Sequence, residues 1–100
     1  MVKVALLAHL VAKPGKEEEV AAFLSGALPL AEAEPLTTVW FALRLSKNEF
    51  GVFDAFDGEA GRKAHLSGPI AAALMAKAEE LFAEPPSIRP VDLLAAKLGK

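Results

Sequence analysis

The strand predicted at the start of the chain is apolar on both of its faces, which restricts the folds available to the rest. Residues 2–12 read as a strand, in which alternate side chains point to opposite faces of a sheet. One face carries Val2, Val4, Leu6, Ala8 and Leu10, and the other carries Lys3, Ala5, Leu7, His9 and Val11. A strand covered on one side only would alternate more cleanly between apolar and polar residues. We therefore expect both faces of this sheet to be covered.

Hydrophobic spacing and turn residues divide the rest of the chain into a regular order of elements. The predicted elements are a helix that opens at Pro14 and is kinked or ended by Pro29, strands at 36–46 and 49–57, a short helix ending at Leu66, a helix at 69–83 and an extended segment at 87–97. Pro90 confines the last segment to a sheet edge or a bulge. The order β-α-β-β-α-β predicts a ferredoxin-like α+β fold in one domain, residues 1–100, with an antiparallel sheet and helices on one face.

The turn between the two middle strands sets which side chains share a face. Lys47 and Asn48 read as a two-residue hairpin loop, so that positions summing to 95 would oppose each other. In this register Trp40 and Phe53 share a face and line a flat aromatic pocket, or simply pack in the core. Asp54 would lie among aromatic residues on the other face, and a buried carboxylate must be paired or neutral. We expect it to form a structural ion pair with an arginine, such as Arg44 or Arg89.

Composition indicates how the second sheet face is covered and excludes several classes of partner. Hydrophobic residues make up 53% of the chain, above the usual ~45–50%. Surplus apolar surface on a small domain favours association with a second copy, so we expect a homodimer. The net charge of −2 argues against a nucleic-acid partner. No segment reaches the ~18–20 apolar residues of a membrane span, and the absence of cysteine fits a cytoplasmic protein.

Two histidines are candidates for chemistry. His65 lies at a corner between two predicted helices, where it could face a cavity as a general base with a pKa near ~6.5, or cap the carbonyls that end its helix. His9 lies in the first strand and reads as a core or pocket-wall residue. Two histidines without a carboxylate at ligand spacing do not make a metal site. The sequence also lacks a phosphate loop, a dinucleotide fingerprint and a Ser-His-Asp order.

Two segments resemble the antibiotic biosynthesis monooxygenase family. The first is Lys13-Pro14-Gly15-Lys16 with three glutamates after the N-terminal strand, and the second is Phe50-x-Val-Phe-Asp54-x-Phe56 followed by His65. In that family the third strand usually carries a glutamate and then an aromatic residue, so Asp54 departs from the pattern and Phe56 holds the aromatic place. The resemblance implies a dimeric α+β barrel. It also implies the activity of that family's enzymes, which include monooxygenases that need no cofactor and act on quinols, anthrones and related aromatic compounds. Haem degradation, known on the same fold, is not expected because no histidine follows His65.

The resemblance and the residues together predict an enzyme that oxygenates an aromatic quinol or anthrone without a cofactor or metal. His65 is the predicted catalytic base, and Trp40, Phe53 and His9 are the predicted substrate-binding residues. A dihydroxy aromatic can itself reduce oxygen once it is deprotonated, so the protein need supply only a base and a dry apolar pocket. One alternative is a non-catalytic dimer that binds or senses a small molecule. Another is an isomerase or decarboxylase of small ring compounds, for which the same base and pocket would serve.

Overall fold

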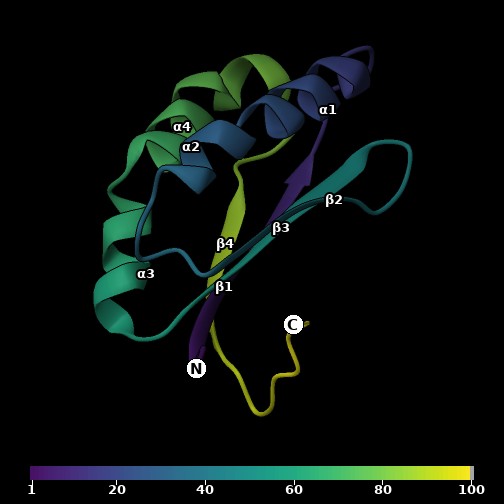
Figure 1. Cartoon of the computed structure of the whole chain (residues 1–100). Coiled ribbons are helices and arrows are strands. Elements are labelled where there is room, and N and C mark those ends of the chain that lie inside the picture. Colours follow the sequence, from purple (N-terminus) through teal and green to yellow (C-terminus); the bar gives the residue numbers. More distant parts are fainter. Residues whose placement is uncertain (100) are drawn as a thin grey trace.

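The computed structural model describes residues 1–99, and in this range four strands form an antiparallel sheet with four helices on one face (Figure 1). The strands are β1 (Val4–Val11), β2 (Val39–Arg44), β3 (Glu49–Phe56) and β4 (Ser87–Asp92). The helices are α1 (Glu17–Gly26), α2 (Leu28–Glu32), α3 (Glu59–Leu66) and α4 (Pro69–Leu81). The order of elements is the predicted one, and the first helical segment is divided next to Pro29, where an interruption was expected. Within residues 1–99, no helix is long and apolar enough to cross a membrane.

The sheet has the strand order β2-β3-β1-β4, and all neighbouring strands are antiparallel. This order and the position of the helices confirm the ferredoxin-like α+β fold. Pro90 lies in β4, which forms one edge of the sheet, as predicted. An edge strand tolerates proline because one side of its backbone has no neighbour to which an N–H must donate.

The main core lies between the sheet and the helices. Phe50 and Phe56 of β3 are almost completely buried there, and Leu10 of β1 lies opposite Phe50. From the helices, the buried residues are Val20 and Leu24 of α1 and Ile70, Leu74 and Leu81 of α4. These residues recur at intervals of four or seven, which is one or two helical turns, so α1 and α4 each turn one apolar stripe toward the sheet.

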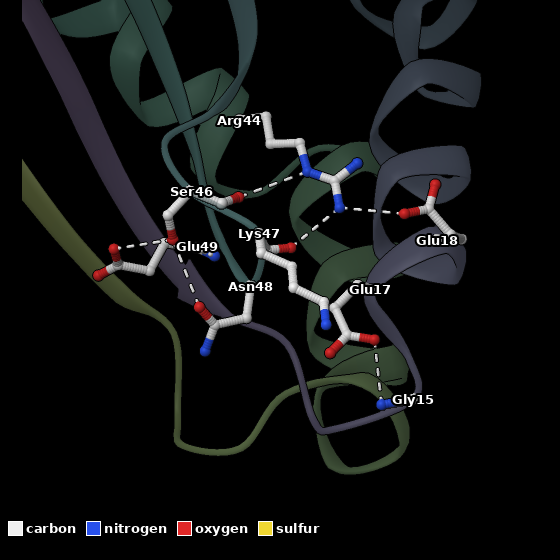
Figure 2. Close-up of polar contacts among 8 residues, drawn as sticks. All are labelled: Gly15, Glu17, Glu18, Arg44, Ser46, Lys47, Asn48 and Glu49. Atoms are coloured by element: carbon white, nitrogen blue, oxygen red, sulfur yellow. Dashed lines mark hydrogen bonds and ion pairs between the residues drawn. The ribbon is translucent and has the colours of Figure 1, made fainter.

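The β2–β3 hairpin differs by one residue from the predicted register. Trp40 pairs with Asp54 and Phe41 pairs with Phe53, so paired positions sum to 94 and not to 95. The loop is longer than two residues because it includes Ser46. The Ser46 hydroxyl accepts a hydrogen bond from the backbone N–H of Glu49, and both residues are labelled in Figure 2. A slip of one residue moves every side chain of a strand to the opposite face. Trp40 therefore shares a face with Asp54, and the predicted pairing of Trp40 with Phe53 on one face is wrong.

Arg44, at the end of β2, connects this hairpin to α1. Its guanidinium donates to Glu18 Oε2 at 3.0 Å and to the backbone oxygen of Lys47 at 2.9 Å (Figure 2). It also lies over the ring of Phe50, 4.9 Å from the centroid. Arg44 is therefore not the partner of Asp54.

The sheet face opposite the helices, here called the outer face, is only partly covered. The segment that follows β4 packs over one end of it, where Leu93 joins a small cluster around Val2, Ala5 and Ala55. Elsewhere the outer face presents Leu7 and Phe41, whose exposed fractions are 41% and 55%. Both faces of the sheet were expected to be covered. Within residues 1–99, only the face that carries the helices is covered along its whole length.

Candidate functional site

His65 is buried where α3 meets the sheet. It lies in the last turn of α3, and only 7% of the residue is exposed. Its ring packs 5.6 Å from the ring of Phe56, centroid to centroid, at the end of β3. Gly61, one turn earlier in α3, lets the helix pack closely against the segment before β2, because a Cβ there would lie 2.8 Å from the backbone oxygen of Leu36. The local sequence thus draws His65 against the sheet.

Two carboxylates hold the His65 imidazole from opposite sides. Nδ1 lies 2.7 Å from Glu34 Oε1, and Nε2 lies 2.9 Å from Asp54 Oδ2. Glu34 belongs to the connection between α2 and β2, and Asp54 points from β3 toward the helices. Thr37 donates a further hydrogen bond to Glu34 Oε1 at 2.7 Å. Because carboxylate oxygens accept hydrogen bonds, both ring nitrogens of His65 act as donors, which is the imidazolium form.

The environment of His65 favours its charged form. Burial lowers the pKa of the imidazole, but the hydrogen bonds that it donates to Asp54 and Glu34, and the negative charges of both, outweigh burial and raise the pKa to about 9. The pKa near 6.5 on which a base role for free imidazole depended is therefore wrong for this structure. At neutral pH the three side chains form a carboxylate–imidazolium–carboxylate cluster, here called the His65 cluster.

The His65 cluster opens on one side into a surface hollow of about 250 Å³, here called the Glu34 hollow. Its lining is apolar apart from a few side chains, and comprises Leu30, Ala33, Glu34, Pro35, Leu36, Thr37, Gly61, Ala64, His65, Gly68 and Pro69. Oε2 of Glu34 is buried and has no hydrogen-bond partner within the described chain. The hollow thus combines an apolar wall and space for a small ring with a carboxylate in its lining, one oxygen of which is buried and unpaired.

A second, smaller cavity lies on the other side of His65, between the sheet and helices α1 and α4. It measures about 40 Å³ and is lined by Asp54, His65 and apolar residues that include Leu6, Val52 and Ile88. Oδ1 of Asp54 is also buried without a partner among residues 1–99. A volume of this size suits one or two water molecules and is too small for an aromatic ring.

The structure brings only some of the predicted site residues together. Asp54 contacts His65, and Trp40 lies opposite Asp54 on the same face of the sheet, with its indole Nε1 buried and unpartnered within residues 1–99. Phe53 and His9 lie on the outer face, where His9 Nε2 is 3.2 Å from Glu49 Oε2. These two residues are therefore remote from the His65 cluster, as is Arg44.

Glu34 is the site residue that the sequence did not reveal. It stands in Ala33-Glu34-Pro35, directly before a proline that ends a helical segment, with no spacing that links it to His65. The two residues are 31 positions apart and meet only through tertiary packing. No set of three or more His, Asp or Glu side chains within residues 1–99 is arranged to hold a metal ion.

Comparison with known structures identifies the class of fold and then the family. The chain has the fold of the antibiotic biosynthesis monooxygenase structures. A provisionally named monooxygenase of this kind from Nitrosomonas europaea matches with a TM-score of 0.80 and 15% identity over 92% of this chain and 90% of that one. Another, from Chloroflexus aurantiacus, matches with a TM-score of 0.72 and 18% identity over 95% and 96% of the two chains. At these identities the likeness is one of fold.

A much closer match is NE2512, a protein of unknown function from Nitrosomonas europaea. It is 60% identical to this chain, with a TM-score of 0.97, over 100% of this chain and 97% of that one. The chain belongs to the same family as NE2512. No protein-family model matches the chain, and neither does any curated protein.

Proposed function

We propose that this protein is a cofactor-independent monooxygenase that acts on an aromatic quinol or anthrone bound in the Glu34 hollow, with His65 in the catalytic centre. The observation that carries the proposal is an apolar hollow lined by His65 and by Glu34, a carboxylate that holds the imidazolium and has one buried, unpaired oxygen, Oε2. A site that is apolar, with a few placed polar groups and a perturbed titrating residue, is the usual form of a small-molecule active site. The fold of the monooxygenase structures supports the same assignment.

In the proposed mechanism a carboxylate, and not free imidazole, accepts the substrate proton. The substrate hydroxyl donates to Glu34 Oε2 and transfers its proton there, leaving an electron-rich phenolate in the hollow. His65 remains protonated, held through Nε2 by Asp54, and its positive charge stabilises the new anion. Oxygen is the oxidant: one of its atoms enters a ring C–H bond of the quinol. Two of the three hydroxyl hydrogens of the resulting triol, one of them the proton held by Glu34, and two electrons of the ring reduce the other atom to water. The ring becomes a hydroxyquinone, and Glu34 is again a carboxylate.

Oxygen uptake by the purified, metal-free protein tests this proposal. Hydroquinones and anthrones should give uptake above the autoxidation blank. In His65→Ala and Glu34→Gln it should fall at least tenfold, equivalent to about 1.4 kcal/mol of transition-state stabilisation. His9→Ala is the matched control, because His9 lies on the outer face and should keep full activity. Equal activity in wild type, His65→Ala and Glu34→Gln would refute the catalytic roles.

A non-catalytic small-molecule binding or sensing protein is the second candidate. It is favoured by one observation: both nitrogens of His65 already donate to carboxylates, so the ring can serve simply to hold α3, β3 and the loop after α2 together. A binding protein would take up a ligand in the Glu34 hollow without consuming oxygen. It would also retain affinity in His65→Ala wherever that variant remains folded.

We also propose that the protein is a homodimer that pairs through its outer face. Exposed Leu7 and Phe41 on this face support the proposal, because a second copy would remove them from water. Sizing should give about twice the 10.5 kDa monomer mass. Phe41→Glu should shift the protein to monomer, whereas Met75→Glu on exposed α4 should not. A wild-type monomer at micromolar concentration would contradict this arrangement.

A further inference from the structure

The electrostatic character of the Glu34 hollow points to the class of substrate that it accepts. We propose that the hollow selects neutral or positively charged hydroxy-aromatic compounds and rejects those with a carboxylate, sulfate or phosphate group, and that Glu34 is the specificity-determining residue. This inference rests on the proposed function, since it concerns the substrate site of that enzyme.

The wall of the hollow offers nothing to balance an anion. Among the described residues that line it, none is Lys or Arg. While Glu34 is ionised, as it is before it accepts a proton, the positive charge of His65 is balanced by two carboxylates: Nδ1 donates to Glu34 and Nε2 donates to Asp54. The remaining polar side chain, Thr37, directs its hydroxyl to Glu34. A negatively charged substituent would thus lose its hydration without gaining a donor, which is unfavourable in an apolar site.

The cluster behind the wall carries excess negative charge. Two carboxylates flank one imidazolium, which leaves a formal charge of −1 on the three side chains at neutral pH. Glu34 is the nearer of the two carboxylates to a ligand, because it lines the hollow, whereas Asp54 lines the inner cavity on the other side of His65. A second anion in the hollow would meet like charge at short range, and a cation would meet the opposite charge.

The start of α4 does not reverse this preference. A helix N-terminus attracts anions, and Gly68 and Pro69 at the start of α4 lie in the wall of the hollow. Glu34 lies beside this helix start, however, since a Cβ placed on Gly68 would lie only 3.2 Å from Glu34 Oε2. A substrate anion that approached the start of α4 would therefore meet a carboxylate at close range.

Three catechols of nearly equal size test the inference. They are 4-ethylcatechol, which is neutral, dopamine, which carries an ammonium group, and 3,4-dihydroxyphenylacetate, which carries a carboxylate. Affinities are measured by calorimetry without oxygen, so that no turnover occurs. The wild type should bind the anion at least tenfold more weakly than the neutral compound, and should bind the cation at least as well as the neutral one.

Glu34→Gln isolates the residue responsible. It keeps the shape of the side chain and makes the cluster neutral, so the affinities for the anion and the neutral compound should come within threefold of each other. Glu32→Gln is the matched control: Glu32 is exposed at the end of α2 and does not line the hollow. That variant should keep the full discrimination.

The outcomes separate the inference from the proposed function. Equal affinities in the wild type, tighter binding of the anion, or no binding of any of the three would overturn the inference. Discrimination that survives in Glu34→Gln would overturn the role of that residue. Oxygen uptake with the hydroquinones and anthrones decides the monooxygenase proposal separately. Oxygen uptake without a charge preference in binding would refute only the inference. A charge preference in binding without oxygen uptake would refute only the proposed monooxygenase activity.

Discussion

Titration of His65 should make the stability of this protein fall as the pH rises above neutrality. In the unfolded chain the imidazole has its usual pKa of 6.5, and in the folded protein the pKa is about 9. Between these values the folded state binds more protons than the unfolded state, so unfolding becomes easier as the pH increases. The contribution of the protonated His65 to stability is therefore fully present below pH 6.5 and is lost as the pH passes 9.

The size of the effect follows from the difference between the two pKa values. Each pKa unit corresponds to ~1.4 kcal/mol, so the free energy of unfolding should decrease by about 3 kcal/mol across this range. Urea unfolding of the wild type and of His65→Gln at a series of pH values measures the loss. The gap between the two proteins should be largest near pH 6 and should shrink by about 3 kcal/mol toward pH 9.5.

Two further measurements keep this prediction testable if His65→Gln does not fold. His9→Gln is the control: His9 lies on the outer face, away from the His65 cluster, so this variant should keep the fall in stability above pH 6.5 that is assigned to His65. In the folded wild type, the NMR shift of the His65 ring protons gives its pKa directly. A pKa below 6.5, or a stability that does not change between pH 6.5 and 9, would refute the assignment of His65 as a buried imidazolium held by two carboxylates.

Four substitutions test the packing of the fold by urea unfolding. Gly61→Ala should destabilise the protein by ~1–3 kcal/mol, since its Cβ would meet backbone at 2.8 Å. Gly26→Ala, with open space around it, should be neutral or stabilising by up to ~1 kcal/mol. Phe56→Ala should cost ~3–5 kcal/mol because this ring is completely buried, and a loss below 1 kcal/mol would contradict its place in the core. Arg44→Ala should cost less than ~1 kcal/mol, because its ion pair with Glu18 is exposed.

The sequence was sufficient to predict the fold but not the hairpin register. Element order and the two-sided apolar strands depend on patterns that span many residues, so small local errors do not affect them. The register depended on one assumption, that Lys47 and Asn48 alone form the loop. The hydroxyl of Ser46 makes a local hydrogen bond that draws a third residue into the turn. Because side chains alternate along a strand, that single residue places Trp40 and Phe53 on opposite faces of the sheet and not on the same one.

Prediction of the site was limited by contacts between distant parts of the chain. His65 and Asp54 were both singled out, but Asp54 was expected to pair with an arginine, and the second carboxylate was missed. The charge balance of a buried site depends on every group that reaches it, and Glu34 reaches it from a loop with no detectable pattern. The same omission gave His65 an ordinary pKa, because a histidine between two carboxylates behaves differently from one at a helix end.

The observed register places the proposed active site and the proposed dimer interface on opposite faces of the sheet. Asp54 and Trp40 point toward the helices and the His65 cluster, whereas Phe41 and Phe53 point toward the outer face. Pairing through the outer face would therefore leave the Glu34 hollow open, since the hollow is built from α3, the start of α4 and the connection after α2. The two proposals can then be separated experimentally: Phe41→Glu should disrupt the dimer without altering substrate discrimination, and Glu34→Gln should do the reverse. If Phe41→Glu also abolished ligand binding, the partner subunit would have to contribute to the hollow, and its placement within one chain would be wrong.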